Sequence, residues 1–168
     1  MQLWIVFNNY MSTNYSKGFS LIELLVVIAI IGILSAVMIP TLASFRGQQA
    51  LKNTTEDLMS LLNVARSDTV GSLNSTNYSV YVDSTSATYF VGSVYTSNAP
   101  TNKKIVFNNA VIIPVSGGLN LNGGGNIVSF SRLSGDTSNY GTIILQLSSD
   151  ANRSKTITIN KTGTVSSN

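Results

Sequence analysis

The feature that most constrains this chain is an apolar run of 21 residues, from Phe19 to Ile39, that carries a single charge, Glu23. At a rise of about 1.5 Å per residue, a helix of this length spans roughly 30 Å, the thickness of the hydrocarbon core of a bilayer. A charged carboxylate at the centre of a lipid-facing helix costs about 2.5 kcal/mol or more, so an acidic residue there indicates a function. Glu23 lies four residues into the run, near one membrane face, where its charge costs less.

The segment from Lys17 to Glu23 has a basic residue, a glycine, a phenylalanine and an early glutamate ahead of the apolar run. It resembles the prepilin-type N-terminal cleavage and methylation segment of type IV pilins and type II secretion pseudopilins, and the resemblance extends to about Pro40. The resemblance implies that a prepilin peptidase cuts after Gly18 and methylates the new terminal amine on Phe19. It also implies that Glu23 aligns each new subunit on the amine of a neighbour in the filament. An ordinary signal anchor with a chance glutamate is the alternative.

Elementary electrostatics also predicts that the Phe19 amine and the Glu23 carboxylate align neighbouring subunits. After cleavage, Phe19 would carry a cation about 6 Å, or one helical turn, from Glu23. In a low-dielectric helix bundle each charge lowers the cost of burying the other, provided that the two meet. A neighbouring chain shifted along the bundle supplies the partner, so the pair selects the register between helices more than it adds stability.

The residues ahead of the apolar run predict a leader, 1–18, that processing removes. Its first stretch, from Met1, is apolar, whereas the stretch from Met11 is short, polar and basic, so we expect translation to start at Met11. Lys17 is the only charge of the leader, and positive charge on the short flank predicts a cytoplasmic N-terminus. We therefore expect a single-pass protein of the cytoplasmic membrane with its C-terminal head outside.

The composition argues against an enzyme. Charged residues make up 10% of the chain, and it has neither Cys nor His. Thiol and zinc chemistry are therefore excluded, and the commonest general base is missing. We expect no cofactor, and the net charge of +3 is too small to indicate nucleic-acid binding by itself.

Helical periodicity continues past the apolar run, over residues 40–71. Pro40 predicts a kink, because proline removes one backbone hydrogen bond, and Gly71 predicts the end of the helix. The predicted apolar stripe consists of Leu51, Leu58, Leu61, Leu62 and Ala65. The predicted water-facing side carries Gln48, Lys52, Asn53, Glu56, Asn63 and Arg66.

Residues 72–168 predict a β-rich head. The alternating Tyr78–Val82 and the segment Ala87–Val91 predict a hairpin. Further strands are predicted at Lys104–Phe107, Val111–Ile113, Ile127–Arg132, Thr142–Leu147 and Lys155–Asn160. Consecutive strands without helical patterns favour an antiparallel sheet packed on the helix, which gives the α+β class.

Three head segments carry a weaker resemblance. Leu58–Asp68, Ile127–Gly135 and Lys155–Val165 resemble motifs of the GspH/FimT-like pilins, which include minor pseudopilins of type II secretion and minor type IV pilins. The family implies as partners other subunits, the prepilin peptidase, an inner-membrane assembly platform and its motor ATPase. The chain itself shows no nucleotide site to drive extraction from the membrane.

A DNA-binding minor pilin of an uptake pilus is the main alternative, since some members of this family bind DNA through a basic C-terminal turn. Here that turn holds Lys161 but no arginine, so the role does not transfer directly. The candidate basic set is Lys103, Lys104, Arg132, Arg153, Lys155 and Lys161. A membrane-anchored enzyme is the third hypothesis.

Weaker signals favour structural roles. The glycine-rich segment Gly117–Gly125 lacks the Lys-Ser/Thr of a phosphate-binding loop, so it predicts a flexible loop. Asp83, Asp136 and Asp150 predict turns rather than a calcium site. The tyrosines at positions 78, 81, 89, 95 and 140 predict core packing for most of their rings rather than a stacking surface.

Overall fold

The computed structural model describes residues 18–168, apart from the side chains of Ile39 and Pro40, so the predicted leader with its two candidate starts lies outside the described residues. The chain divides into two units, one ending at Pro40 and the other comprising Thr41–Asn168. Helix α1, Leu21–Val70, begins in the first unit and ends in the second. Its last residue directly precedes Gly71, as predicted.

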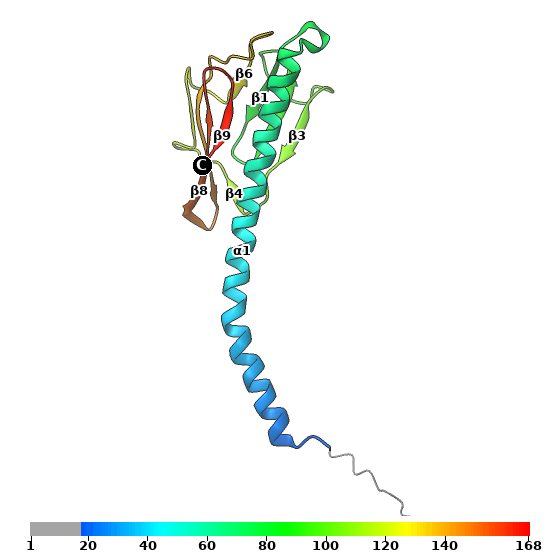
Figure 1. The fold of residues 1–168 in the computed structure, drawn as a ribbon, viewed down its shortest axis with the longest axis vertical. Helices are drawn as coiled ribbons and strands as arrows, with labels where there is room; N and C mark the ends of the chain where they lie inside the picture. The colour runs from blue at the N-terminus through cyan, green and yellow to red at the C-terminus, as the bar shows by residue number, and fades with distance from the viewer. Residues whose placement is uncertain (1–17) are drawn as a thin grey trace, which may run out of the picture. The chain divides into compact units, whose positions relative to one another are not determined.

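The fold is α+β, a long helix followed by antiparallel strands, which confirms the predicted class (Figure 1). One sheet has the order β3-β2-β1-β6, and the other has the order β4-β7-β8-β9, with β5 also pairing with β7. The first sheet consists of β1 (Tyr78–Val82), β2 (Ser86–Val91), β3 (Lys103–Val106) and β6 (Ile127–Ser129). The second consists of β4 (Val111–Ile112), β5 (Leu119–Leu121), β7 (Gly141–Leu147), β8 (Asp150–Ile159) and β9 (Val165–Ser167). A short 3-10 helix, η1 (Leu73–Ser75), joins α1 to β1.

The part of α1 in the second unit packs its apolar stripe on both sheets. Leu51, Leu58, Leu62 and Ala65 are buried, and Leu61 is half-buried. They share one core with Val80 of β1, Ile143 of β7 and Ile157 of β8, among others. Burial of a large aliphatic side chain stabilises a fold by about 1.5–3 kcal/mol, so this stripe holds helix and sheets together.

The water-facing side of the helix was predicted correctly except at one position. Gln48, Lys52, Asn53, Glu56 and Asn63 are exposed. Arg66, in contrast, is half-buried, and its guanidinium donates hydrogen bonds to the carbonyl oxygens of Gly135 and Thr162 at 3.3 and 3.2 Å. The prediction failed there because a helical repeat shows which side a residue faces, but not which loops of the chain return to cover it.

The strand predictions were wrong in four places. Strand β9, which pairs with β8, was not predicted. The predicted flexible loop Gly117–Gly125 contains β5, which pairs with β7. Strand β8 begins at Asp150, five residues before the predicted Lys155, so Asp150 is a strand residue. Strand β6 ends at Ser129, which leaves Arg132 in a loop rather than on a strand. The single predicted sheet is two sheets.

The tyrosine prediction holds for two of the five rings. Tyr78 and Tyr89 are buried and stacked, with ring centroids 5.2 Å apart, whereas Tyr81, Tyr95 and Tyr140 are half-buried. Asp83 lies between β1 and β2 and accepts a hydrogen bond from the backbone N–H of Ser84, as a turn carboxylate does. Asp150, predicted in a turn, is instead the first residue of β8. Residues 18–168 contain no group of three or more acidic side chains arranged to hold a metal ion.

Candidate functional site

The candidate site is the start of α1, where the helix has a well-defined N-cap. Ser20 precedes the first helical residue, Leu21, and its side-chain oxygen accepts a hydrogen bond from the backbone N–H of Glu23 at 3.2 Å. A serine at the N-cap with a glutamate three positions later is the pattern of a capping box. Glu23 also lies in the first turn, where the helix dipole favours a negative charge by about 0.3–1 kcal/mol.

This cap is a functional detail that the sequence reasoning missed, although its signal is present as Ser20-Leu21-Ile22-Glu23. It fixes the starting point of the helix and so places Glu23 one turn from the chain start that cleavage would create. The predicted helix start at Phe19 is two residues too early.

Gly18 and Phe19 lie in an open, non-helical segment. A Cβ atom built on Gly18 has no heavy atom within 4 Å, and the side chain of Phe19 is 83% exposed. The fold of this chain therefore imposes no need for a glycine at position 18. A requirement for glycine there must come from an external partner that reads the segment.

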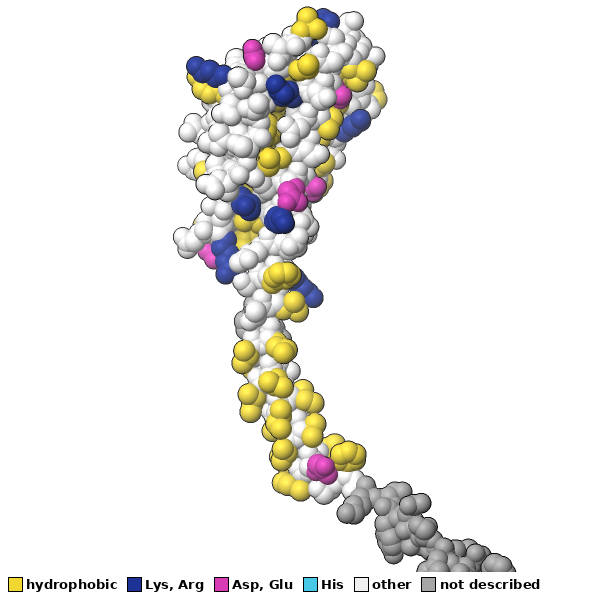
Figure 2. Space-filling model, in the orientation of Figure 1, with side chains coloured by type: hydrophobic (Ala, Val, Ile, Leu, Met, Phe, Trp, Pro, Cys, Tyr) yellow, Lys and Arg dark blue, Asp and Glu magenta, His cyan; other side chains and the backbone are white. Residues whose placement is uncertain are grey.

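Beyond Glu23, α1 exposes apolar side chains on all sides up to Met38. Leu24 is 60% exposed and Val37 is 69% exposed, and hydrophobic side chains dominate the visible surface of this segment (Figure 2). Among the described residues, α1 is the one helix long and apolar enough to cross a membrane, with a mean hydropathy of 2.9 over its most apolar stretch. So large an apolar surface is stable when lipid or other helices cover it.

Helix α1 continues through Pro40. Pro40 is also the last residue of the first unit. The kink expected at this position stays a prediction.

The six candidate nucleic-acid contacts lie in three places on the head. Lys103 and Lys104 belong to β3, and Arg153 and Lys155 belong to β8 of the other sheet. Arg132 and Lys161 lie in neighbouring loops, which are joined by a hydrogen bond from Thr137 N–H to the Lys161 carbonyl oxygen. In Figure 2 the Lys and Arg side chains are likewise scattered over the visible face of the head.

The structure brings together the three head segments that resemble GspH/FimT-like motifs. Arg66, from the first segment, donates to the carbonyl oxygens of Gly135, in the second, and Thr162, in the third. The two loops meet so closely that a Cβ atom on Gly163 would fall on the carbonyl oxygen of Gly135. We name this contact the Arg66 clip.

Residues 13–39 match the family model of the prokaryotic N-terminal methylation motif. This match covers Gly18, Phe19 and Glu23, and it supports the type IV pilin and pseudopilin family. Neither a curated protein nor a solved structure matches the chain significantly.

Proposed function

We propose that this protein is a structural subunit of a type IV pilus or a type II secretion pseudopilus. The observation that carries the proposal is the methylation motif over residues 13–39, which leads into an exposed apolar helix. The motif indicates a pilin-like subunit rather than an enzyme. Together with the apolar helix, it supports a protein anchored in the membrane before assembly.

In this proposal, a prepilin peptidase removes residues 1–18 and methylates the amine of Phe19. Residues 19–39 then form the membrane anchor and later the filament core, 40–71 continue the helix, and 72–168 form the head. Glu23 of an incoming subunit pairs with the Phe19 amine of a subunit already in place. The open surroundings of Gly18 support this processing step, because the segment is accessible to a protease.

Helix packing supplies the cohesion of the proposed filament. Association of apolar helices in lipid relies on close van der Waals contact, which small residues permit. Ala29, Gly32, Ser35 and Ala36 provide such positions along α1, and a Cβ atom on Gly32 has no neighbour within 4 Å in the isolated chain. An inner-membrane assembly platform and its motor ATPase would supply the energy for extraction.

We further propose that the subunit is a minor pilin or pseudopilin of the GspH/FimT-like type. The Arg66 clip supports this proposal, because three segments that resemble that family converge on one side chain. The scattered basic set gives the DNA-binding alternative no comparable support.

The test is mass spectrometry of the N-terminus after expression with a prepilin peptidase. We expect a mature chain that begins at Phe19 and carries a methylated amine. Expression without the peptidase is the control and should give the intact leader. An unprocessed chain in the presence of an active peptidase would overturn the proposed function.

A further inference from the structure

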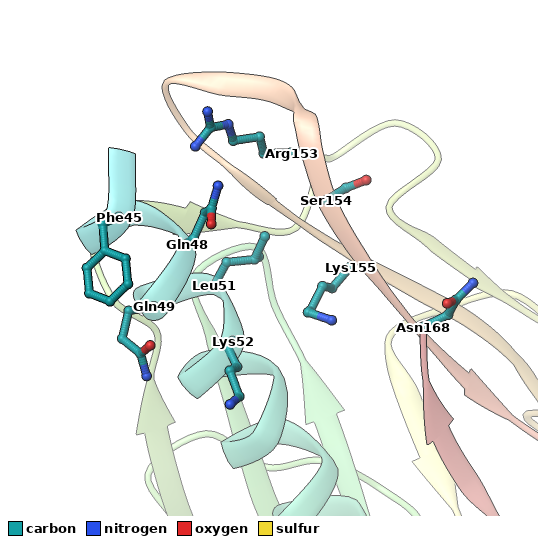
Figure 3. Close-up of a pocket in the computed structure, with 9 residues that line it drawn as sticks. All are labelled: Phe45, Gln48, Gln49, Leu51, Lys52, Arg153, Ser154, Lys155 and Asn168. Carbon is teal, nitrogen blue, oxygen red and sulfur yellow. The ribbon is translucent and has the colours of Figure 1, made fainter. Parts of the chain in front are cut away.

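A groove of about 430 Å³ lies between α1 and the start of β8 in the head (Figure 3). Lys52 belongs to its helix wall, and Arg153 and Lys155 belong to its strand wall. Its described lining includes these three cationic side chains and no Asp or Glu. We name it the cationic groove.

The cationic groove begins where β9 ends. Strand β9 pairs with β8 over Ile157–Ile159, and the backbone of Asn168 then exchanges two hydrogen bonds with that of Thr156, at 3.0 and 3.3 Å. Strand β8 itself begins at Asp150, so its residues 150–155 extend past the last of these backbone pairs. This part of β8 pairs with β7 on one side, and its other side is an open sheet edge among the described residues.

Ser154 presents backbone groups at this open edge. In an antiparallel sheet, the N–H and C=O groups of successive residues point to opposite sides of the strand. Those of Thr156 point towards β9, so those of Ser154, two residues earlier, point to the same side. The pairing with β7 agrees, because Ile144, opposite Thr156, donates its N–H to the Gly118 carbonyl oxygen rather than to β8. Ser154 can therefore donate to and accept from one further strand.

The cations of the groove are used unequally within the chain. Arg153 pairs with Asp150 at 3.3 Å. Lys52 has an exposed contact with Glu56 at 3.9 Å, and exposed pairs of this kind are weak. Lys155 is half-buried, and its side chain makes no hydrogen bond or ion pair with any described residue. Lys155 is therefore available to an anion from outside the chain.

The position of Lys155 determines which segment suits the groove. Lys155 shares a face of β8 with the buried Ile157, so its side chain points towards α1, as Figure 3 shows. Residues directly opposite each other on paired strands have Cβ atoms about 5 Å apart. A side chain opposite Lys155 on an added strand would thus meet an unpaired ammonium group. A carboxylate suits that position best, because a hydrogen bond between two charged groups is the stronger kind.

We propose that the cationic groove binds an extended, acidic segment of a different protein, which adds to β8 as a strand in line with β9. The backbone of Ser154 holds the segment, and its carboxylates meet Lys155 and Lys52. In strand addition of this kind, main-chain hydrogen bonds give affinity and alternate side chains give specificity. The partner is a different chain, so the inference goes beyond the proposed function and applies equally to a minor subunit.

The test uses the full chain in a non-ionic detergent, with three capped eight-residue peptides as probes. Each peptide alternates threonine with a second residue, which is glutamate, glutamine or lysine. Fluorescence polarisation of the labelled peptides measures their dissociation constants. We expect the glutamate peptide to bind at least tenfold more tightly than the other two. If it does not bind at millimolar concentrations, the inference is wrong and Lys155 is a charge that protects a sheet edge.

Two pairs of matched variants locate the contact. Ser154→Pro removes the N–H that faces the groove, and proline is tolerated at such edge positions. Ser167→Pro is the same change on β9, where the N–H faces away from β8 and the residue is outside the groove lining. Ser154→Pro should weaken binding at least fivefold, and Ser167→Pro should leave it unchanged. Lys155→Gln should likewise weaken binding at least fivefold, whereas Lys104→Gln, on β3, should not.

Equal melting temperatures of the variants would exclude unfolding as the cause, and the lysine pair decides if Ser154→Pro lowers the melting temperature. Binding that survives in a folded Ser154→Pro variant would overturn strand addition. Binding that falls equally in Lys155→Gln and Lys104→Gln would show general charge attraction and overturn the inference as well. The measurement requires neither processing nor filaments, so its outcome is independent of the N-terminal test of the proposed function.

Discussion

Replacing Glu23 with valine separates the cost of this charge in lipid from its proposed use in assembly. The carboxylate gains about 0.3–1 kcal/mol from the helix dipole in the first turn of α1. Its charge costs about 2.5 kcal/mol or more at the bilayer centre and less near the interface. Glu23→Val should therefore leave membrane insertion intact or improve it. Cleavage after Gly18 should also continue, because Gly18 has no neighbour within 4 Å that the change would disturb.

Assembly should respond in the opposite direction. Two unit charges 4 Å apart interact by about 4 kcal/mol at an effective dielectric constant of about 20. Loss of that interaction corresponds to a roughly thousandfold loss of preference for the correct register, since about 1.4 kcal/mol is a factor of ten. Glu23→Asp, with a shorter side chain, should be intermediate.

Membrane fractionation, N-terminal mass spectrometry and a filament assay on the same cells provide the measurements. The expected pattern is wild-type insertion and cleavage for all variants, with filament yield falling from Glu to Asp to Val. If Glu23→Val assembled at the wild-type level, the register mechanism and the central functional proposal would both be refuted.

The other predictions concern processing, the loops of the head, a buried phenol and DNA. Gly18→Leu should block cleavage in a mass-spectrometric assay while the melting temperature of the head stays unchanged, because a side chain at that position meets nothing in the fold. Gly163→Ala should lower the free energy of unfolding by about 1–3 kcal/mol or more in urea titrations, because its φ is 71° and its Cβ would meet the Gly135 carbonyl. Gly117→Ala is the control: its φ is 74° but it has no neighbour within 4 Å, so it should lower the free energy of unfolding by less. Burial, together with a hydrogen bond to a carboxylate, raises the pKa of Tyr89 above its usual 10.0. The contribution of Tyr89 to the free energy of unfolding should therefore be fully present below pH 10 and fall above it by about 1.4 kcal/mol per pH unit. Tyr89→Phe should flatten that slope. In a salt-titrated gel shift the full chain in detergent should not retard duplex DNA at low salt, and a retarded band that disappears steeply with salt would favour the DNA-binding alternative.

The parts of the fold that the sequence predicted are those governed by strong local patterns. The stripe of Leu51, Leu58 and Leu62 repeats with helical spacing, and all three residues are buried. Strand β1 was predicted with its observed bounds, Tyr78–Val82, because β-branched and aromatic residues alternate there. At the candidate site, Gly18, Phe19 and Glu23 stand in a short pattern that needs no tertiary context to be recognised.

The parts that the sequence did not predict depend on contacts with distant segments. Strand β5, Leu119–Leu121, is three residues long, and its pairing with β7 defines it as a strand. The first half of β8 is polar, and pairing with β7 extends it back to Asp150. Arg66 was assigned to water because its contacts, Gly135 and Thr162, are 69 and 96 residues away in the chain. No local periodicity encodes such partners.

The N-terminal motif and the head of this molecule carry different functional information. The N-terminal methylation motif over residues 13–39 would, under the proposed function, be shared by any subunit of its kind. It says nothing about which neighbours the head contacts in a filament. That information lies in the head, where Arg66 of α1 donates hydrogen bonds to the carbonyl oxygens of Gly135 and Thr162 and so holds together three segments that are far apart in the sequence. A contact of this kind shapes the end of the head that distinguishes one subunit from another, whereas the N-terminal motif does not.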